Sequence, residues 1–233
     1  MKIAGIDSCP LGWIVILQDQ SRFSGLAVTQ FSELIALHPN LKRVFIDIPI
    51  GLSSENFSRT VETSMRKKLE KRASTVFTPA CREAVYAKNY DDAREINKRV
   101  LGKSISIQSH NISKKIQEID LFFQEKSSIL EMYESHPEID FKYLNESKIV
   151  SSKKSTKEGF QERFQLLISL VPELEDLYQS IRSTYPKSKV KPDDILDAMV
   201  LCVSNLKSDI NNLRFIEDEN HTDANGISIK IAY

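Results

Sequence analysis

Four carboxylates stand at positions from which α/β proteins commonly do chemistry. Each lies at the exit of a predicted strand or in the first turns of a long predicted helix: Asp7, Asp47, Glu134 and Asp197. Asp47 carries the strongest signal, because it interrupts the apolar stretch "VFIDIPIGL". An ionised carboxylate in a buried strand is costly unless it is paired or bound to a metal. These four residues are therefore the first candidates for a functional site.

Carboxylate oxygens without thiolates suit Mg²⁺ or Mn²⁺ better than zinc. A pair of such ions can activate a water and stabilise the leaving oxygen in phosphodiester hydrolysis. We therefore predict one catalytic and metal-binding set, made of Asp7, Asp47, Glu134 and Asp197. Two alternatives stay open: Asp7 could be a structural turn residue, and Asp197 competes with Asp193 and Asp194, either of which could be only a helix cap.

Three further residues could contact the substrate. His136 follows Glu134 in "YESHPE" and could steer a water or bind metal, although a His-Pro pair also forms structural turns. Lys153 and Lys154 precede a predicted helix, whose N-terminus could hold a phosphate. Cys9 has no neighbouring base marked in the sequence, so we expect it to be a small buried residue rather than a nucleophile.

The charge of the chain is balanced overall but unevenly placed. The formal net charge is zero, yet the segment from Arg59 to Lys103 holds twelve Lys or Arg against six Asp or Glu. A basic segment on an acidic body could gather nucleic acid. A solvated helical surface explains the same pattern.

The elements that must position these residues begin with a strand-rich third. Antiparallel strands are predicted over Lys2–Ile6, Trp13–Leu17 and Phe23–Val28, then a helix near Phe31–Leu37 and a strand over Val44–Ile50. A strand that returns after a helix is typically parallel to its predecessor. The sequence therefore predicts an α/β fold with a mixed sheet whose first three strands are antiparallel.

The remainder alternates helices with returns to the sheet. We predict a helical insertion over about 53–128, a strand over Ile129–Tyr133, and a helix from a capping box at Ser155 and Glu158 to about Leu170. A strongly amphipathic helix then follows Asp193, with an apolar stripe from Ile195 to Ile210, and a hairpin joins Leu213–Ile216 to Ile227–Ile231.

Length and composition agree with a single domain over residues 1–233. Apolar residues make up 41% and charged residues 27%, as in ordinary globular proteins. No apolar run approaches the roughly 18 residues of a membrane span, and the N-terminus lacks a signal-peptide pattern. The three cysteines are odd in number, which suits a reducing compartment. We expect a cytoplasmic protein with no membrane partner; a homodimer is one of the oligomeric states left open.

Seven motifs in order also carry a family resemblance: "GIDSCPLGW", "FIDIPIGL", "VFTPACREAV", "SIQSHNISKKIQEID", "YESHPEIDF", "KKSTKEGFQER" and "DDILDAMVL". Together they resemble the family called domain of unknown function 429, described as predicted RNase H-like nucleases, from Ile3 to about Ile231. The resemblance implies an RNase H-like mixed sheet flanked by helices, and its acidic positions fall on Asp7, Asp47, Glu134 and Asp197.

The family motifs also bear on substrate binding in the insertion. We add three insertion residues to the predicted substrate-binding set, which becomes Arg72, Arg82, Gln108, His136, Lys153 and Lys154. Two positions depart from the family pattern, since Ala80 replaces a proline and His110 an aromatic residue. Both departures lie in the insertion, so they bear on substrate choice more than on metal binding.

The leading functional prediction is a divalent-metal-dependent nuclease that acts on DNA or RNA. A second class is a nucleotide-dependent phosphotransferase or ATPase of the related actin-like fold, which also begins with a strand ending in Gly-Ile-Asp. Such enzymes cradle phosphates with glycine-rich loops, whereas this chain has seven glycines and no pair of such loops. A non-catalytic nucleic-acid-binding module is the third alternative, because a fold alone does not fix a function.

Overall fold

The structure is a computed structural model that describes residues 1–125, 130–208 and 213–233. Its chain forms two compact units, which are treated separately below. The first unit comprises Met1–Asp47, Ile129–Arg214 and Ala232–Tyr233, and the second comprises Ile48–Ser128 and Phe215–Ile231. All four predicted catalytic carboxylates belong to the first unit.

The first unit is built on a mixed sheet. Its strands are β1 (Lys2–Ser8), β2 (Trp13–Asp19), β3 (Arg22–Val28), β4 (Leu41–Ile46) and β5 (Glu131–Ser135). They lie in the order β3-β2-β1-β4-β5, with β1, β2 and β3 antiparallel and β1, β4 and β5 parallel. The predicted α/β class and mixed sheet with three antiparallel strands are confirmed.

Strand β4 is shorter at its exit than the sequence suggested. It ends at Ile46, and the amide of Asp47 makes one further bond to the Ile6 carbonyl at 3.0 Å. Pro49 follows two residues later and has no N–H with which to continue the ladder. Asp47 therefore stands just beyond the regular strand, rather than in its middle.

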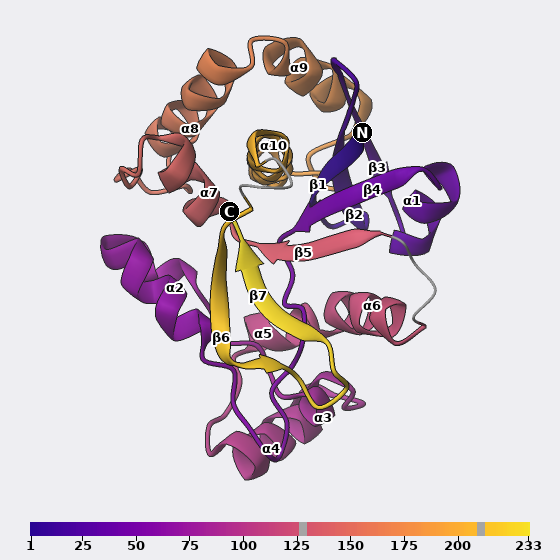
Figure 1. Ribbon diagram of the computed structural model, residues 1–233, viewed down its shortest axis with the longest axis vertical. Coiled ribbons are helices and arrows are strands. Elements are labelled where there is room, and N and C mark those ends of the chain that lie inside the picture. Colours follow the sequence, from indigo (N-terminus) through magenta and orange to yellow (C-terminus); the bar gives the residue numbers. More distant parts are fainter. Residues whose placement is uncertain (126–129, 209–212) are drawn as a thin grey trace. The chain divides into compact units, whose positions relative to one another are not determined.

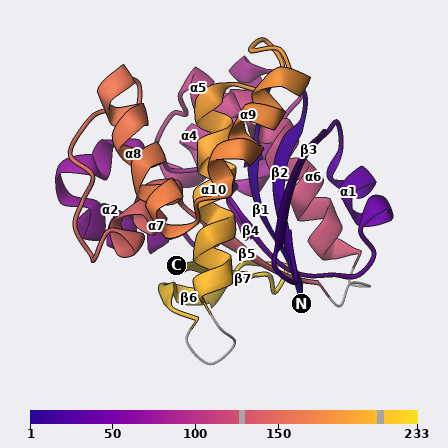
Figure 2. The same ribbon diagram turned by 90° about the horizontal axis from the view of Figure 1, so that it is seen from above.

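Helix α10 (Pro192–Lys207) packs against one face of this sheet. Figure 1 shows α10 end-on, with α7 (Pro137–Leu144), α8 (Lys157–Leu170) and α9 (Leu174–Thr184) around it. Figure 2 shows α10 running along the strands, with α1 (Phe31–Leu37) on the other side of the sheet. All residues of α10 from Ile195 to Asn205 are buried, so this helix is the centre of the core of the unit.

The contact between α10 and β1 is unusually close. A Cβ atom added to Gly5 would lie 2.1 Å from the Cys202 nitrogen and 2.3 Å from the Ala198 carbonyl oxygen. A non-bonded pair of heavy atoms is at its best separation at about 3.5–4.0 Å, so no other residue type fits at position 5 without displacing the helix. Gly5 also shows that the face of β1 that carries residues 3, 5 and 7 is the one that meets α10.

Helix ends mostly follow the sequence signals. Helix α8 begins one residue later than the predicted capping box, because Thr156 is the N-cap and its hydroxyl accepts from the Gly159 amide at 3.1 Å. The predicted strand start at Ile129, the final residues of the predicted insertion and the predicted stripe residue Ile210 lie outside the described residues.

The second unit is mostly helical, as the predicted insertion suggested. It contains α2 (Val61–Leu69), the 3₁₀ helix η1 (Glu70–Thr75), α3 (Arg82–Val85), α4 (Tyr90–Leu101), α5 (Ile107–Asn111) and α6 (Ser113–Gln124). The hairpin strands β6 (Phe215–Thr222) and β7 (Ser228–Ala232) fall almost entirely in the same unit. The Asp223 carboxylate closes the turn by accepting from the amides of Asn225 and Ile227.

Candidate functional site

Two aspartates meet at the exits of neighbouring parallel strands. Ile6 of β1 pairs with Ile46 of β4, so the next residues, Asp7 and Asp47, are neighbours on one face of the sheet. This is the face that meets α10, because Gly5 precedes Asp7 by two residues and touches that helix. Carboxyl ends of parallel strands are the usual place for ligand binding in such sheets.

Helix α10 brings a third aspartate to the same place. Asp197 is 2% exposed and Asp7 is 7% exposed. The Lys154 ammonium, from the loop before α8, donates to Asp197 Oδ2. Asp197 Oδ1 is buried and has no hydrogen-bond partner among the described residues. We call Asp7, Asp47, Asp197 and Lys154 the acidic cluster.

Burial and mutual repulsion make these carboxyls hard to ionise. Burial, followed by the charges of Asp197 and Asp47, raises the pKa of Asp7 well above its usual value. Burial raises the pKa of Asp47 to about 6, although the charge of Lys154 opposes the shift. Burial also raises the pKa of Asp197 to about 7, again against the effect of Lys154. Three carboxyls with raised pKa values in one place are typical of a functional site.

Lys154 is the counter-charge of the cluster. Burial by itself lowers the pKa of this amine, but the carboxylates of Asp197, Asp7 and Asp47 outweigh burial and the net pKa is raised. The lysine therefore stays protonated at neutral pH and balances one of the three carboxylates. Two potential negative charges remain without a matching cation in the cluster.

The donor set of the cluster suits a hard divalent cation. Its ligand atoms would be carboxylate oxygens, which Mg²⁺ and Mn²⁺ prefer. The unpartnered Asp197 Oδ1 is a buried ligand atom that is not used by the protein itself. No three His, Cys, Asp or Glu side chains in the described ranges are already gathered closely enough to hold a metal. Lys154 is the cation that Asp197 binds, so a divalent ion would compete with this ammonium group.

The strand register does not place Glu134, the fourth predicted ligand, beside Asp7 and Asp47 on their face of the sheet. Glu134 of β5 pairs with Ile46, so its side chain starts on the sheet face opposite that of Asp47. Glu134 is buried, at 6% exposed. The β5 residue in the Asp47 row is Ser135, whose hydroxyl donates to Asp140. The metal-binding role of Glu134 therefore stays a prediction.

The structure gives the two competing aspartates of α10 different roles. Asp194 accepts the Lys191 amide at 3.0 Å and so closes the first turn of the helix. Asp197, one turn later, is the one that pairs with Lys154. Asp197 is therefore the better candidate ligand, and Asp194 is a helix cap whose pKa is raised by burial.

The other predicted substrate residues of the first unit divide between structural and surface roles. His136 is the N-cap of α7, where its ring nitrogen accepts from the Glu138 amide at 3.2 Å, as expected for a structural turn. Lys153 is exposed and precedes the N-terminus of α8. Lys154 lies inside the acidic cluster instead of at the helix end.

Three predicted substrate residues belong to the second unit. Arg82 donates one terminal nitrogen to Asp120 and the other to Asp223, so two carboxylates already occupy its best donors. Arg72 lies in η1, and Gln108 is exposed on α5. Their contact with a substrate stays a prediction, and Arg82 has a clear structural role.

The sequence reasoning missed Asp140, which lies beneath the acidic cluster. Asp140 is fully buried and accepts from the hydroxyls of Ser135 and Ser204, each at 2.6 Å. Burial raises its pKa to about 8, and the charge of Asp47 contributes to the shift. Its position in "HPEID", six residues after Glu134, was the available signal, but no helix was predicted after the His-Pro pair, so nothing indicated which side chains of this segment are buried.

An ion pair between α7 and α8 was also missed. Arg163 donates to the Glu138 carboxylate from Nε and Nη2, and its Nη1 donates to the carbonyls of Ser152 and Gly159. Neither side chain of the pair is more than 5% exposed. The partners are 25 positions apart, so no local sequence pattern marks them.

No helix in the described part of the chain is long and apolar enough to cross a membrane. Comparison with known proteins gives a single kind of match. No curated protein and no solved structure is significantly similar to this chain. A family described as "protein of unknown function (DUF429)" matches residues 5–221. This match covers most of the chain and includes every residue of the acidic cluster. The chain therefore belongs to the DUF429 family.

Proposed function

We propose that the protein is a divalent-metal-dependent nuclease that hydrolyses phosphodiester bonds at the acidic cluster. The observation that carries the proposal is the gathering of Asp7, Asp47 and Asp197, from two strands and a helix, with only one ammonium group as counter-charge. A site built for stability would match its charges, because unpaired buried carboxylates are costly. Asp7 and Asp197 are buried and Asp47 is half-buried, and this surplus of carboxylates over cations is what a cation site needs.

In this proposal Asp7, Asp47 and Asp197 hold Mg²⁺ or Mn²⁺, and Glu134 is a proposed fourth ligand. The ions would supply an activated water and charge stabilisation at the leaving oxygen. Lys154 would bind a phosphate oxygen of the substrate once a divalent ion has taken its place beside Asp197. Lys153 is exposed and directly precedes Lys154 in the sequence. It would extend this contact along the nucleic-acid backbone.

The glycines count against the alternative of a nucleotide-dependent phosphotransferase. Five of the seven are already committed to close packing within the protein, because a Cβ at Gly5, Gly12, Gly25, Gly51 or Gly159 would lie less than 3 Å from another atom. The turn after β1 is also closed on itself, with mutual amide-carbonyl bonds of 3.0 Å between Cys9 and Gly12. This leaves few glycines for a loop that cradles phosphates.

We propose a cytoplasmic location as well. The three cysteines, Cys9, Cys81 and Cys202, are all buried and none forms a disulfide, which suits a reducing compartment. DNA and RNA are both retained as substrate classes, and a homodimer stays an open alternative.

The test is cleavage of a panel of labelled single-stranded, double-stranded and hybrid DNA and RNA by the full chain, with Mg²⁺, Mn²⁺ or chelator. ATP turnover is measured in parallel. We expect metal-dependent cleavage that falls by at least about 100-fold in Asp47→Asn and Asp197→Asn, the size typical of losing one electrostatic catalytic group. Asp193→Asn is the matched control, because it makes the same change on α10 outside the cluster.

Three results would overturn the proposal in different ways. Cleavage that survives both cluster substitutions would place the activity elsewhere or in a contaminant. ATP turnover without cleavage would favour the phosphotransferase. Binding of nucleic acid with neither reaction would favour the non-catalytic module.

A further inference from the structure

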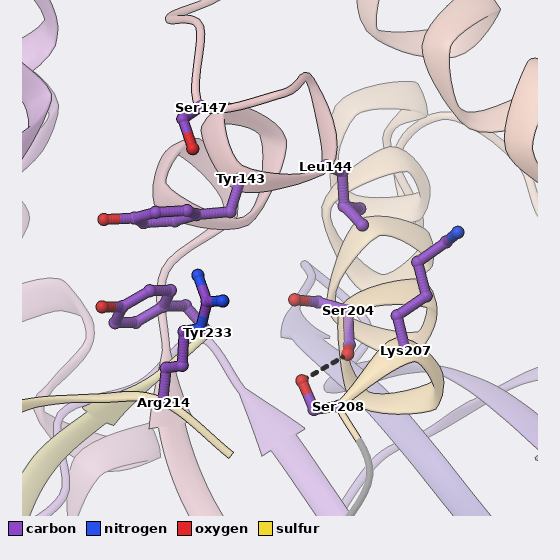
Figure 3. Close-up of a pocket in the computed structure, with 8 residues that line it drawn as sticks. All are labelled: Tyr143, Leu144, Ser147, Ser204, Lys207, Ser208, Arg214 and Tyr233. Atoms are coloured by element: carbon purple, nitrogen blue, oxygen red, sulfur yellow. Dashed lines mark hydrogen bonds between the residues drawn. The ribbon is translucent and has the colours of Figure 1, made fainter. Parts of the chain in front are cut away.

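A polar cavity lies in the first unit. Its volume is about 470 Å³, and the residues that line it are Tyr143, Leu144, Ser147, Ser204, Lys207, Ser208, Arg214 and Tyr233. Figure 3 shows the end of α7 and the turn after it on one side and the last turns of α10 on the other. Sites for small organic ligands commonly measure about 300–1,000 Å³. None of the lining residues belongs to the acidic cluster.

The charge of this cavity is positive. Lys207 and Arg214 are both exposed and line it from two sides, and the described residues that line it include no Asp or Glu. Neither side chain forms an ion pair with another described residue, whereas a few exposed cations, such as Arg94 and Lys148, do. Figure 3 shows the Arg214 guanidinium beside the Tyr233 ring, whereas the Lys207 ammonium points away from it on the other side of α10. Two cations on one cavity favour an anionic ligand, which a rotation of the exposed Lys207 side chain would bring into contact with both.

The hydroxyl groups of the cavity add a second requirement. Ser204 Oγ already donates to Asp140, and Ser208 Oγ donates to the Ser204 carbonyl at 2.8 Å. Because their protons are engaged, these oxygens are left to accept hydrogen bonds from a ligand. The favoured ligand is thus an anion that also carries hydroxyl donors, as a sugar phosphate does.

The aromatic wall gives the cavity a fixed shape. The rings of Tyr143 and Tyr233 stack with centroids 4.2 Å apart and an interplanar angle of 25°. The amide of Tyr233 also bonds the Arg214 carbonyl at 3.1 Å, so the chain that carries this arginine is tied to the wall. A preformed wall lowers the entropic cost of binding a small ligand.

We propose that this cavity binds a small phosphorylated ligand of the size of a sugar phosphate or nucleoside monophosphate. Lys207 and Arg214 hold the phosphate, and Ser204 and Ser208 accept hydrogen bonds from sugar hydroxyls. The inference is independent of the nuclease activity, because it uses no residue of the acidic cluster.

The test is calorimetric titration of the full chain in metal-free buffer with inorganic phosphate, ribose 5-phosphate, adenosine and adenosine monophosphate. Omitting divalent metal prevents phosphate from binding through an ion at the acidic cluster. We expect saturable binding of ribose 5-phosphate and adenosine monophosphate, each at least about tenfold tighter than phosphate or adenosine alone, since one charged hydrogen bond is worth about that factor.

Two pairs of variants make the assignment specific. Arg214→Gln and Lys207→Gln should each weaken adenosine monophosphate binding by about tenfold. Arg22→Gln and Lys187→Gln are matched controls, because they remove an exposed charge of the same unit outside the cavity. They should leave binding unchanged.

A last arm identifies the source of the phosphate. An oligonucleotide with a 5′-phosphate that competes with adenosine monophosphate would assign the cavity to a strand end, and one that does not compete would assign it to a free metabolite. The proposal is overturned if no phosphorylated probe binds saturably, or if the control variants weaken binding as much as Arg214→Gln and Lys207→Gln.

Discussion

Two buried ionic centres of the first unit involve neighbouring helices and have opposite designs. The Arg163–Glu138 pair matches one cation with one carboxylate, and each guanidinium nitrogen donates to an oxygen. The acidic cluster sets one ammonium against three carboxyls and leaves Asp197 Oδ1 without a partner. Burial alone therefore does not distinguish the two centres.

The two centres differ in whether their charges are paired and their polar atoms hydrogen-bonded. A buried charge that is paired and fully hydrogen-bonded holds helices together, and it costs stability only when one partner is removed. A buried group of like charges opposes folding until something neutralises it. The first design is structural, and the second leaves charge that protons or the proposed divalent cation would neutralise. Each of the following experiments separates the two designs.

The largest effect is expected from breaking the matched pair. Arg163→Met removes the guanidinium that binds the buried Glu138 carboxylate and the Ser152 and Gly159 carbonyls, so the free energy of unfolding should fall by about 3–5 kcal/mol. Chemical denaturation measures this loss, with Arg22→Met as the exposed control. The double variant Arg163→Met/Glu138→Met should recover most of it. A loss below about 1 kcal/mol in the single variant would show that the pair is not a structural anchor.

The next effect is a pH dependence that only the unmatched cluster produces. Asp47 and Asp197 have raised pKa values of about 6 and about 7 in the folded protein. The folded state therefore binds protons that the unfolded state has released, and stability is complete below about pH 4 and lost as pH rises to about 7. Denaturation in chelator should show a loss on the order of 2 kcal/mol between pH 5 and pH 8.

Asp140, with its pKa of about 8, adds to the same trend in every variant. The comparison is therefore made with the double variant Asp47→Asn/Asp197→Asn, in which the slope should be clearly smaller. An unchanged slope would mean that the cluster carboxyls do not titrate in this range.

A smaller effect is expected when one cluster charge is neutralised. Asp47→Asn removes repulsion, so the metal-free protein should gain about 1 kcal/mol of stability at pH 8. The variant should also lose part of the thermal stabilisation by Mn²⁺, which arises because the ion binds the native state only. Thermal melts in chelator and in Mn²⁺ decide this. A variant that melts lower in chelator and keeps the full metal-induced shift would make Asp47 a structural residue.

The smallest effect belongs to the helix cap. Asp194→Asn keeps a side-chain oxygen for the Lys191 amide, so it should cost no more than about 0.5 kcal/mol. Its Mn²⁺-induced shift in melting temperature should equal that of the wild type. If this shift shrank as much as in Asp47→Asn, Asp194 would have to be counted among the ligands.

The strands that carry Asp7 and Asp47 could be read from the sequence because their signals are local. Apolar runs predicted β1 to β4, and the register confirms that Asp7 and Asp47 leave the sheet side by side. The polarity of Asp47 in an apolar run already pointed to a site, since propensity and burial conflict there.

The surroundings of Lys154 and Glu134 could not be predicted from the sequence, because they depend on contacts between segments that are distant along the chain. Lys154 was predicted to meet phosphate at a helix end, yet it reaches Asp197, 43 positions away. Glu134 looked equivalent to the other carboxylates, but the parallel pairing of β4 with β5 sets it on the other face. A shift of one residue in register reverses every side chain of a strand, and no local pattern specifies that register here.

The close approach of α10 to β1 has a consequence for how the acidic cluster could evolve or be redesigned. The distance between Asp7 and Asp197 is set by the hydrogen that Gly5, two residues before Asp7, carries in place of a side chain against Ala198 and Cys202 of the helix. A methyl group at position 5 would push α10 away from β1. It would therefore increase the distance between Asp7 and Asp197 without removing either carboxylate. The strength of the repulsion is therefore controlled from a position with no polarity of its own. Surveys that rank residues by charge or reactivity would overlook Gly5, although it acts as the spacer of the site.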